Sequence, residues 1–142
     1  MNNDIRARQI AEKLLENDPF SQWLGIQIID VKEGYCKIQM TLRAEMLNGF
    51  GITHGGVVFS FADSALAFSC NNRNNLSLAQ DTSINFLKPS KAGDVIIAEA
   101  KELHNGRSTG LYLITIHNQQ GDQIALFKGT CFRTGKALFE GM

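Results

Sequence analysis

The chain has 142 residues, 44% of them hydrophobic, and its 14 basic and 14 acidic side chains give a formal net charge of zero at pH 7. This length predicts one domain over residues 1–142, and the balanced charge, without a Lys/Arg cluster, disfavours nucleic acid or an anionic membrane as a partner and favours a small molecule. Three widely spaced cysteines without a C-x-x-C pair, and an N-terminus without a hydrophobic signal core, predict reduced thiols in a cytoplasmic protein that spans no membrane.

Residues 1–17 are predicted to form an amphipathic N-terminal helix. Apolar side chains between Ile5 and Leu15 recur at helical spacing, and Asp18-Pro19 ends the pattern. The apolar residues that follow either cover one end of the core or line a pocket for an aryl group, and the sequence leaves both interpretations open: Phe20, Trp23 and Leu24.

Residues 25–42 are predicted to form a β-hairpin with one buried face. Apolar residues such as Cys36, Ile38 and Met40 alternate with polar ones, which is the period of a strand. The segment Lys32-Glu33-Gly34 supplies the turn.

Residues Gly55–Cys70 are predicted to form a helix that is buried on nearly every side, because they carry almost no polar face. A series of strand-like runs separated by turn signals follows, before a tail over residues 134–142: Leu78–Leu87, Asp94–Leu103, Leu111–Asn118 and Gln123–Arg133. Short connections favour antiparallel neighbours. The pattern therefore predicts an α+β fold in which a curved antiparallel sheet wraps around one central helix.

The most informative segment is the loop from Asn48 to Gly56, which leads directly into the buried helix. Two glycines at a helix start leave backbone N–H groups uncovered, at the positive end of the helix dipole. The Gly55 N–H could stabilise the oxygen of a thioester carbonyl, which gains negative charge during hydrolysis. The alternative is that Gly55 and Gly56 only allow the helix to pack closely under the sheet. His54 either holds this loop or contacts the thioester.

Asp63 is the one carboxylate of the apolar helix. A buried carboxylate is costly unless it is paired, hydrogen-bonded or functional, and burial raises its pKa towards the range of a general base. Asp63 could also attack a carbonyl directly. The alternative is an Asp at an exposed edge of the helix, or one that caps a neighbouring loop.

The spacing of Gly55 and Asp63 predicts a site shared between two subunits. Eight residues span about 12 Å of helix, so one thioester carbon cannot contact both groups within a single subunit. If both act in one reaction, Asp63 must come from a second chain, as in a two-fold dimer with two equivalent sites.

Four features together resemble the hotdog-fold thioesterases, and most closely the phenylacetic acid degradation, or PaaI-type, family: Asn48, the His54-Gly55-Gly56 turn, Asp63 and the later segment Ile84-Asn85-Phe86-Leu87-Lys88-Pro89. The resemblance covers most of the chain, residues 18–133. It implies a sheet wrapped around the central helix and a dimer with a continuous sheet, usually paired into a homotetramer. It also implies hydrolysis of acyl-coenzyme A (CoA) thioesters without a metal or other cofactor.

The resemblance also implies residue roles. In the family, the residue matching Gly55 polarises the thioester carbonyl through its N–H, the match to Asn48 assists, and the match to Asp63 of the partner subunit activates water or attacks. Some relatives hold the water with a serine where this chain has Ala79. Thr82 or Ser83 could substitute for it, or the water needs only Asp63, so the choice between a general base and a nucleophile stays open. The remaining candidates for contacting substrate or CoA are Gly56, Thr82, Ser83, Lys88, Arg107, Ser108 and Arg133.

The sequence therefore predicts an acyl-CoA thioesterase, with a preference for aryl-acetyl or hydroxyphenylacetyl groups that rests on the resemblance alone. Two alternatives share the fold. A hotdog hydratase or dehydratase requires a His and an acid placed for proton abstraction, and His54 lacks the proline-rich motif expected around it. A non-catalytic acyl-CoA-binding protein keeps the pocket but retains its ligand without hydrolysis.

Overall fold

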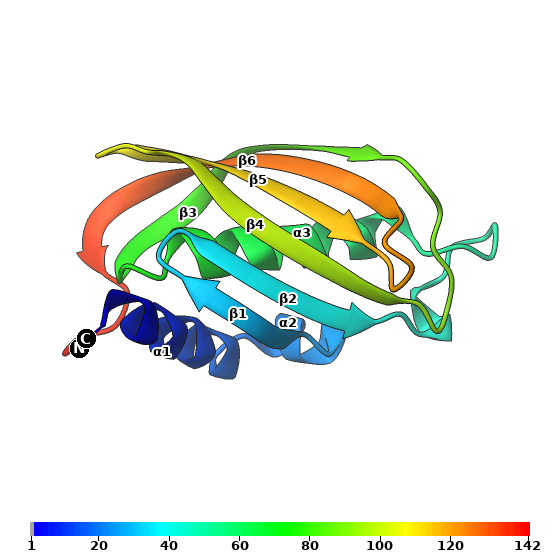
Figure 1. Cartoon of the computed structure of the whole chain (residues 1–142), viewed down its shortest axis with the longest axis horizontal. Coiled ribbons are helices and arrows are strands. Elements are labelled where there is room, and N and C mark those ends of the chain that lie inside the picture. Colours follow the sequence, from blue (N-terminus) through cyan, green and yellow to red (C-terminus); the bar gives the residue numbers. More distant parts are fainter. Residues whose placement is uncertain (1) are drawn as a thin grey trace.

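A computed structural model describes residues 2–142 as one antiparallel sheet of six strands that curves around a long helix (Figure 1). The strand order is β1-β2-β4-β5-β6-β3. In chain order the elements are α1 (Asn3–Glu16), α2 (Pro19–Leu24), β1 (Gln27–Lys32), β2 (Tyr35–Thr41), the 3-10 helix η1 (Ala44–Met46), α3 (Gly55–Cys70), β3 (Asn75–Phe86), β4 (Val95–Asn105), β5 (Thr109–His117) and β6 (Gln123–Ala137).

This architecture confirms the predicted α+β fold with a central helix, and it differs in two elements. Pro19–Leu24 form a short helix where the sequence predicted only a break, because Asp18 caps it and Pro19 occupies its first turn. Strand β6 runs on to Ala137, into the region predicted as a tail, because it stays paired with the long strand β3.

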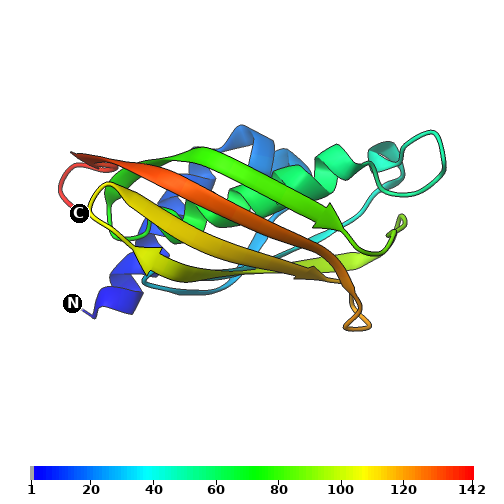
Figure 2. The same cartoon turned by 90° about the horizontal axis from the view of Figure 1, so that it is seen from above.

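Helix α3 lies in the concave face of the sheet and forms the centre of the core (Figures 1 and 2). Phe61, Ala65 and Phe68 are fully buried in it, and the alternate residues of the facing strands are buried against them. Small residues bring helix and sheet close: a side chain at Gly129 of β6 would come within 2.9 Å of Leu66. The tight packing fixes where each end of α3 lies.

Helices α1 and α2 cover the side of the core that the sheet leaves open (Figure 2). Ala7, Ile10 and Ala11 of α1 are buried. In α2, Leu24 is fully buried, whereas Phe20 and Trp23 are about half exposed and stack on each other with ring centroids 6.1 Å apart. Leu24 therefore covers the core, and the two aromatic rings remain outside it.

Strand β3 forms one edge of the sheet. It pairs with β6 along one side only, and its residues from Leu78 to Asp81 are exposed. An unpaired edge of this length can pair with a strand from another chain. No helix within residues 2–142 is both long and apolar enough to cross a bilayer.

Candidate active site

The start of α3 presents a backbone donor that the fold leaves free. His54 is the N-cap, and its Nδ1 accepts a 2.8 Å hydrogen bond from the Gly56 N–H. The loop before it is fixed, since the Thr53 N–H bonds to Ser90 and the His54 N–H to Met46. Within residues 2–142, nothing accepts a hydrogen bond from the Gly55 N–H. That group carries the positive end of the helix dipole.

Gly55 lines a cavity of about 410 Å³. Its lining combines the loop before α3, the end of β3 and the β3–β4 connection: Asn48, Ile52, Thr53, Gly55, Val58, Phe86, Leu87, Lys88, Pro89, Ser90 and Ile124. A Cβ at Gly55 would lie 3.1 Å from the Phe86 ring. Glycine at this position therefore allows Phe86 to pack closely against the start of α3.

Asn48 is oriented by its own loop. Its Oδ1 accepts hydrogen bonds from the Phe50 N–H at 2.9 Å and the Ile52 N–H at 3.3 Å. Because the oxygen is used in this way, the side-chain NH₂ is the group left to donate to a ligand in the same cavity.

Asp63 lies two turns further along α3 and lines a different cavity, of about 240 Å³, against α2. Burial raises the pKa of the Asp63 carboxyl above its ordinary value of 3.8, and the negative charge of Asp18 raises it further. Phe20 of α2 and Phe59 of α3 line the same cavity. A half-buried carboxylate with a raised pKa beside apolar rings suits a general base or a nucleophile.

Gly55 and Asp63 therefore face two separate cavities of one chain. Asn48 and Lys88 share the cavity of Gly55, and Lys88 lies 3.5 Å from Asp122 on the surface. The predicted donor and carboxylate are thus not brought together within a single subunit, as their spacing along the helix required.

Two predicted binding residues have their donors already used within the fold of this subunit. The Gly56 N–H bonds to His54 and is not free for a ligand. Arg133 is 8% exposed, and its guanidinium makes five hydrogen bonds inside the fold, so it cannot reach a CoA phosphate. The acceptors are the Gly106 and Cys70 carbonyls, Ser77 Oγ, Asn105 Oδ1 and Tyr112 Oη.

Strand β3 separates the two hydroxyl candidates. Thr82 pairs with Gly129 and lies on the face towards α3, since its Cγ2 and Leu66 both lie beside Gly129. Ser83 is the next residue and faces the opposite, outer side, beside Lys128. Of the two candidates, Thr82 therefore lies on the face towards α3.

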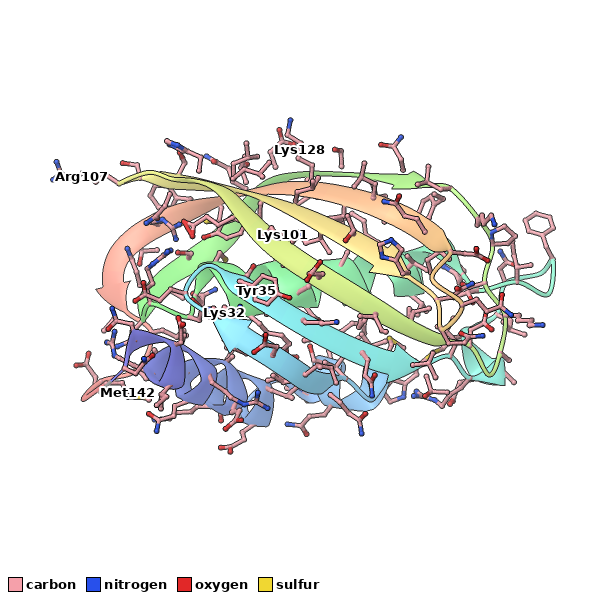
Figure 3. The ribbon with its side chains drawn as sticks, in the orientation of Figure 1. Lys32, Tyr35, Lys101, Arg107, Lys128 and Met142 are labelled. Atoms are coloured by element: carbon pink, nitrogen blue, oxygen red, sulfur yellow. The ribbon has the colours of Figure 1, made fainter. Side chains whose placement is uncertain are left out.

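Arg107 and Ser108 lie in the β4–β5 turn, and Figure 3 places Arg107 at the far tip of that hairpin. The loop before α3, with Asn48, lies at the other end of the sheet (Figure 1). Within one subunit, the structure does not bring Arg107 and Ser108 to the cavity of Gly55.

Sequence reasoning missed three residues that border the Asp63 cavity: Asp18, Ser21 and Ser64. They are linked by hydrogen bonds from α2 to α3. Asp18-Pro19 was taken as a helix break, although Asp followed by Pro is also the signature of a helix start. Within residues 2–142, no group of three or more His, Cys, Asp and Glu side chains is placed to hold a metal ion.

Comparison with known proteins agrees with this geometry. The Thioesterase superfamily model matches residues 50–125. The acyl-coenzyme A thioesterase PaaI of Escherichia coli is 44% identical over 130 residues, which cover 92% of this chain and 93% of that protein. The solved structure of the E. coli PaaI protein from the phenylacetic acid degradation operon superposes with a TM-score of 0.94 at 42% identity, over 96% of this chain and 99% of that one.

A hypothetical thioesterase protein from Streptococcus pneumoniae, solved with coenzyme A, superposes with a TM-score of 0.82 at 26% identity, over 88% of this chain and 98% of that one. The family match includes the Gly55 turn, Asp63 and the end of β3 that lines the first cavity. The chain belongs to the thioesterase superfamily.

Proposed function

We propose that the protein hydrolyses acyl-CoA thioesters to a free acid and CoA. The observation that carries this proposal is the unpaired Gly55 N–H at the start of α3, in a residue that lines one cavity together with Asn48. Two donors in one cavity suit a carbonyl oxygen that becomes an oxyanion. The similarity to the E. coli acyl-CoA thioesterase supports the same chemistry.

In the proposed reaction, the thioester oxygen accepts hydrogen bonds from the Gly55 N–H and Asn48. The partner subunit's Asp63 removes a proton from a water molecule, whose oxygen attacks the carbonyl carbon. The tetrahedral intermediate collapses, the C–S bond breaks, and the CoA thiolate takes up a proton. In the alternative route, the partner's Asp63 attacks the carbonyl carbon, the C–S bond breaks and the CoA thiolate leaves and takes up a proton. Water then hydrolyses the mixed anhydride, which releases the acid and restores the Asp63 carboxylate.

The shared site requires a dimer, and the free edge of β3 supports one. Pairing of β3 with its copy across a two-fold axis would extend the sheet and set the two α3 helices antiparallel. The carboxylate from one subunit would then approach the helix start of the other. We propose that such dimers pair into a homotetramer, as the family resemblance implies.

For CoA, we propose that Lys88 contacts the phosphates at the mouth of the cavity and that Thr82 lies near the attacking water. The exposed Arg107 and Ser108 could contact the nucleotide only from the partner subunit, because they lie at the other end of their own sheet.

The three free cysteines fit a protein of the reducing cytoplasm.

We propose aryl-acetyl and hydroxyphenylacetyl groups as the preferred acyl chains. The Asp63 cavity is bordered by the rings of Phe20 and Phe59, which suit an aromatic acyl group. The similarity to a protein of the phenylacetic acid degradation operon points to the same class.

The test is thiol release from a panel of aryl-acetyl, short-chain and long-chain acyl-CoA esters, with wild type and Asp63→Asn. We expect turnover fastest on aryl-acetyl esters and a loss of roughly 10²–10⁴-fold in kcat for Asp63→Asn. Full turnover by Asp63→Asn contradicts the role of Asp63. Ester binding without thiol release would instead indicate a binding protein, and hydration of an enoyl ester would indicate a hydratase.

A further inference from the structure

A chain of hydrogen bonds connects α2 to α3 beside Asp63. Asp18, the N-cap of α2, accepts from the Ser21 N–H at 3.0 Å and from the Ser21 hydroxyl at 2.5 Å. The Ser21 and Ser64 oxygens lie 2.8 Å apart. Ser64 directly follows Asp63 in α3. The Asp18 carboxylate is thus tied to the helical turn that carries Asp63.

The direction of each hydrogen bond in this series follows from which groups can donate. The Ser21 hydroxyl proton points to Asp18, so Ser64 must donate to Ser21. Ser21 is 1% exposed and Ser64 8%, so the bond between the two hydroxyls is buried, whereas the bonds to Asp18 are partly buried. A buried, fully oriented network of this kind holds its elements in one arrangement.

The two carboxylates also interact through charge. Asp18 and Asp63 border the same cavity, and the remaining side chains around it carry no charge: Phe20, Ser21, Phe59, Ser60, Ser64 and Ala67. From α2 and α3, the elements packed around this cavity, Asp18 is the only titratable group beside Asp63 within residues 2–142. Two like charges in a partly buried space oppose ionisation of the second group, and the Asp18 charge raises the pKa of Asp63 accordingly.

We propose that Asp18 is a positioning residue of the reaction, which holds Asp63 in place through Ser21 and Ser64 and sets by its charge the pH at which Asp63 becomes active. This inference rests on the proposed role of Asp63. It gives α2 a function in catalysis although none of its residues reacts with the substrate.

The experiment compares the pH dependence of kcat/KM for wild type and Asp18→Asn. Asn removes the charge but remains a good N-cap, so α2 is expected to stay in place. We expect the acidic limb of the profile to move to lower pH, because Asp63 then ionises more easily. Glu140→Gln removes an equal charge from the exposed C-terminal segment and serves as the matched control, with an unchanged limb.

Ser64→Ala separates the two parts of the proposal, since it breaks the link and keeps the charge. We expect kcat to fall on the plateau, KM to change little, and the acidic limb to stay in place. Asp18→Ser, also a good N-cap, repeats the charge removal should the Asn variant fold poorly. Thermal unfolding of each variant verifies that it is folded.

An acidic limb of Asp18→Asn that coincides with wild type overturns the inference, as does an equal shift in Glu140→Gln. If Asp63→Asn is inactive and Asp18→Asn unshifted, only the inference fails. If Asp63→Asn keeps full turnover, the proposed function fails first.

Discussion

Burial and the Asp18 charge raise the pKa of Asp63, and this affects folding as well as turnover. In the folded state the carboxyl binds its proton more tightly than in the unfolded chain. Above the ordinary value of 3.8 the free energy of unfolding therefore falls as pH rises, and the loss is complete above the raised pKa.

We accordingly expect Asp63→Asn to stabilise the protein at neutral pH while it removes turnover. Asp63 is only partly buried, so a gain of about 1 kcal/mol or less is expected, and it should shrink as the pH approaches 3.8. Denaturant unfolding at several pH values measures this. A variant less stable than wild type at neutral pH would contradict the expectation.

His54 can be tested as a helix cap. Its Nδ1 accepts the Gly56 N–H, so His54→Ala leaves that donor unpaired and is expected to cost about 1 kcal/mol. His54→Asn supplies another cap oxygen and should restore most of the stability. Comparing both by denaturant unfolding, with kcat measured alongside, separates holding the loop from contact with the thioester. Loss of kcat in the stable Asn variant would indicate direct contact.

Arg133 can be tested as a structural cation. Arg133→Lys keeps the charge but cannot make five hydrogen bonds to the buried acceptors, among them the Cys70 carbonyl and Ser77. We expect a loss of roughly 2–4 kcal/mol in unfolding free energy with an unchanged KM for CoA esters. A raised KM with unchanged stability would return Arg133 to the CoA site.

At the scale of elements, the sequence was most informative where a pattern is long. The apolar run from Gly55 to Cys70 predicted α3 with its observed bounds, and the alternating runs predicted every strand, with ends shifted by a few residues. Helix α2 has only six residues, less than two turns, so it shows no periodicity from which it could be predicted.

The candidate site residues also differ in how well the sequence predicts them. Asn48, Gly55 and Asp63 stand in or beside one continuous segment, so local pattern and family resemblance could identify them. The sequence predicts Arg133 as a phosphate contact because it shows the charge but not the acceptors, which here come from five other elements or turns. Asp18 was not predicted as a site residue for a similar reason, since its connection to Asp63 depends on a tertiary contact between two helices.

The free edge of β3 allows a test of whether strand pairing between subunits forms the proposed dimer. Gln80 is exposed and lies where the register with β6 shifts, between Ala79 and Asp81. Gln80→Pro should spare most of the β3–β6 pairing and block pairing with a second β3. We expect a monomer with little activity, by light scattering and thiol release, whereas Gln80→Ala keeps the oligomeric state and the activity of wild type. An active Gln80→Pro monomer would contradict the shared site.

For the whole molecule, a site built from two subunits predicts complementation between two inactive variants. Asp63→Asn and Asn48→Ala are each expected to be inactive alone. A heterodimer of the two retains one intact site, made from Asn48 and Gly55 of one chain and Asp63 of the other. Random association on co-expression should therefore restore about a quarter of the wild-type activity. If no activity returns although heterodimers form, each subunit works alone.

The burial of Cys36, Cys70 and Cys131 has a practical consequence. A disulfide reagent added to follow the released thiol will find no protein sulfhydryl at the surface, so the colour it develops in a native sample reports product alone. Without substrate, the rate at which the same reagent labels the protein reports the rate of unfolding, because each chain that unfolds exposes three reactive thiols.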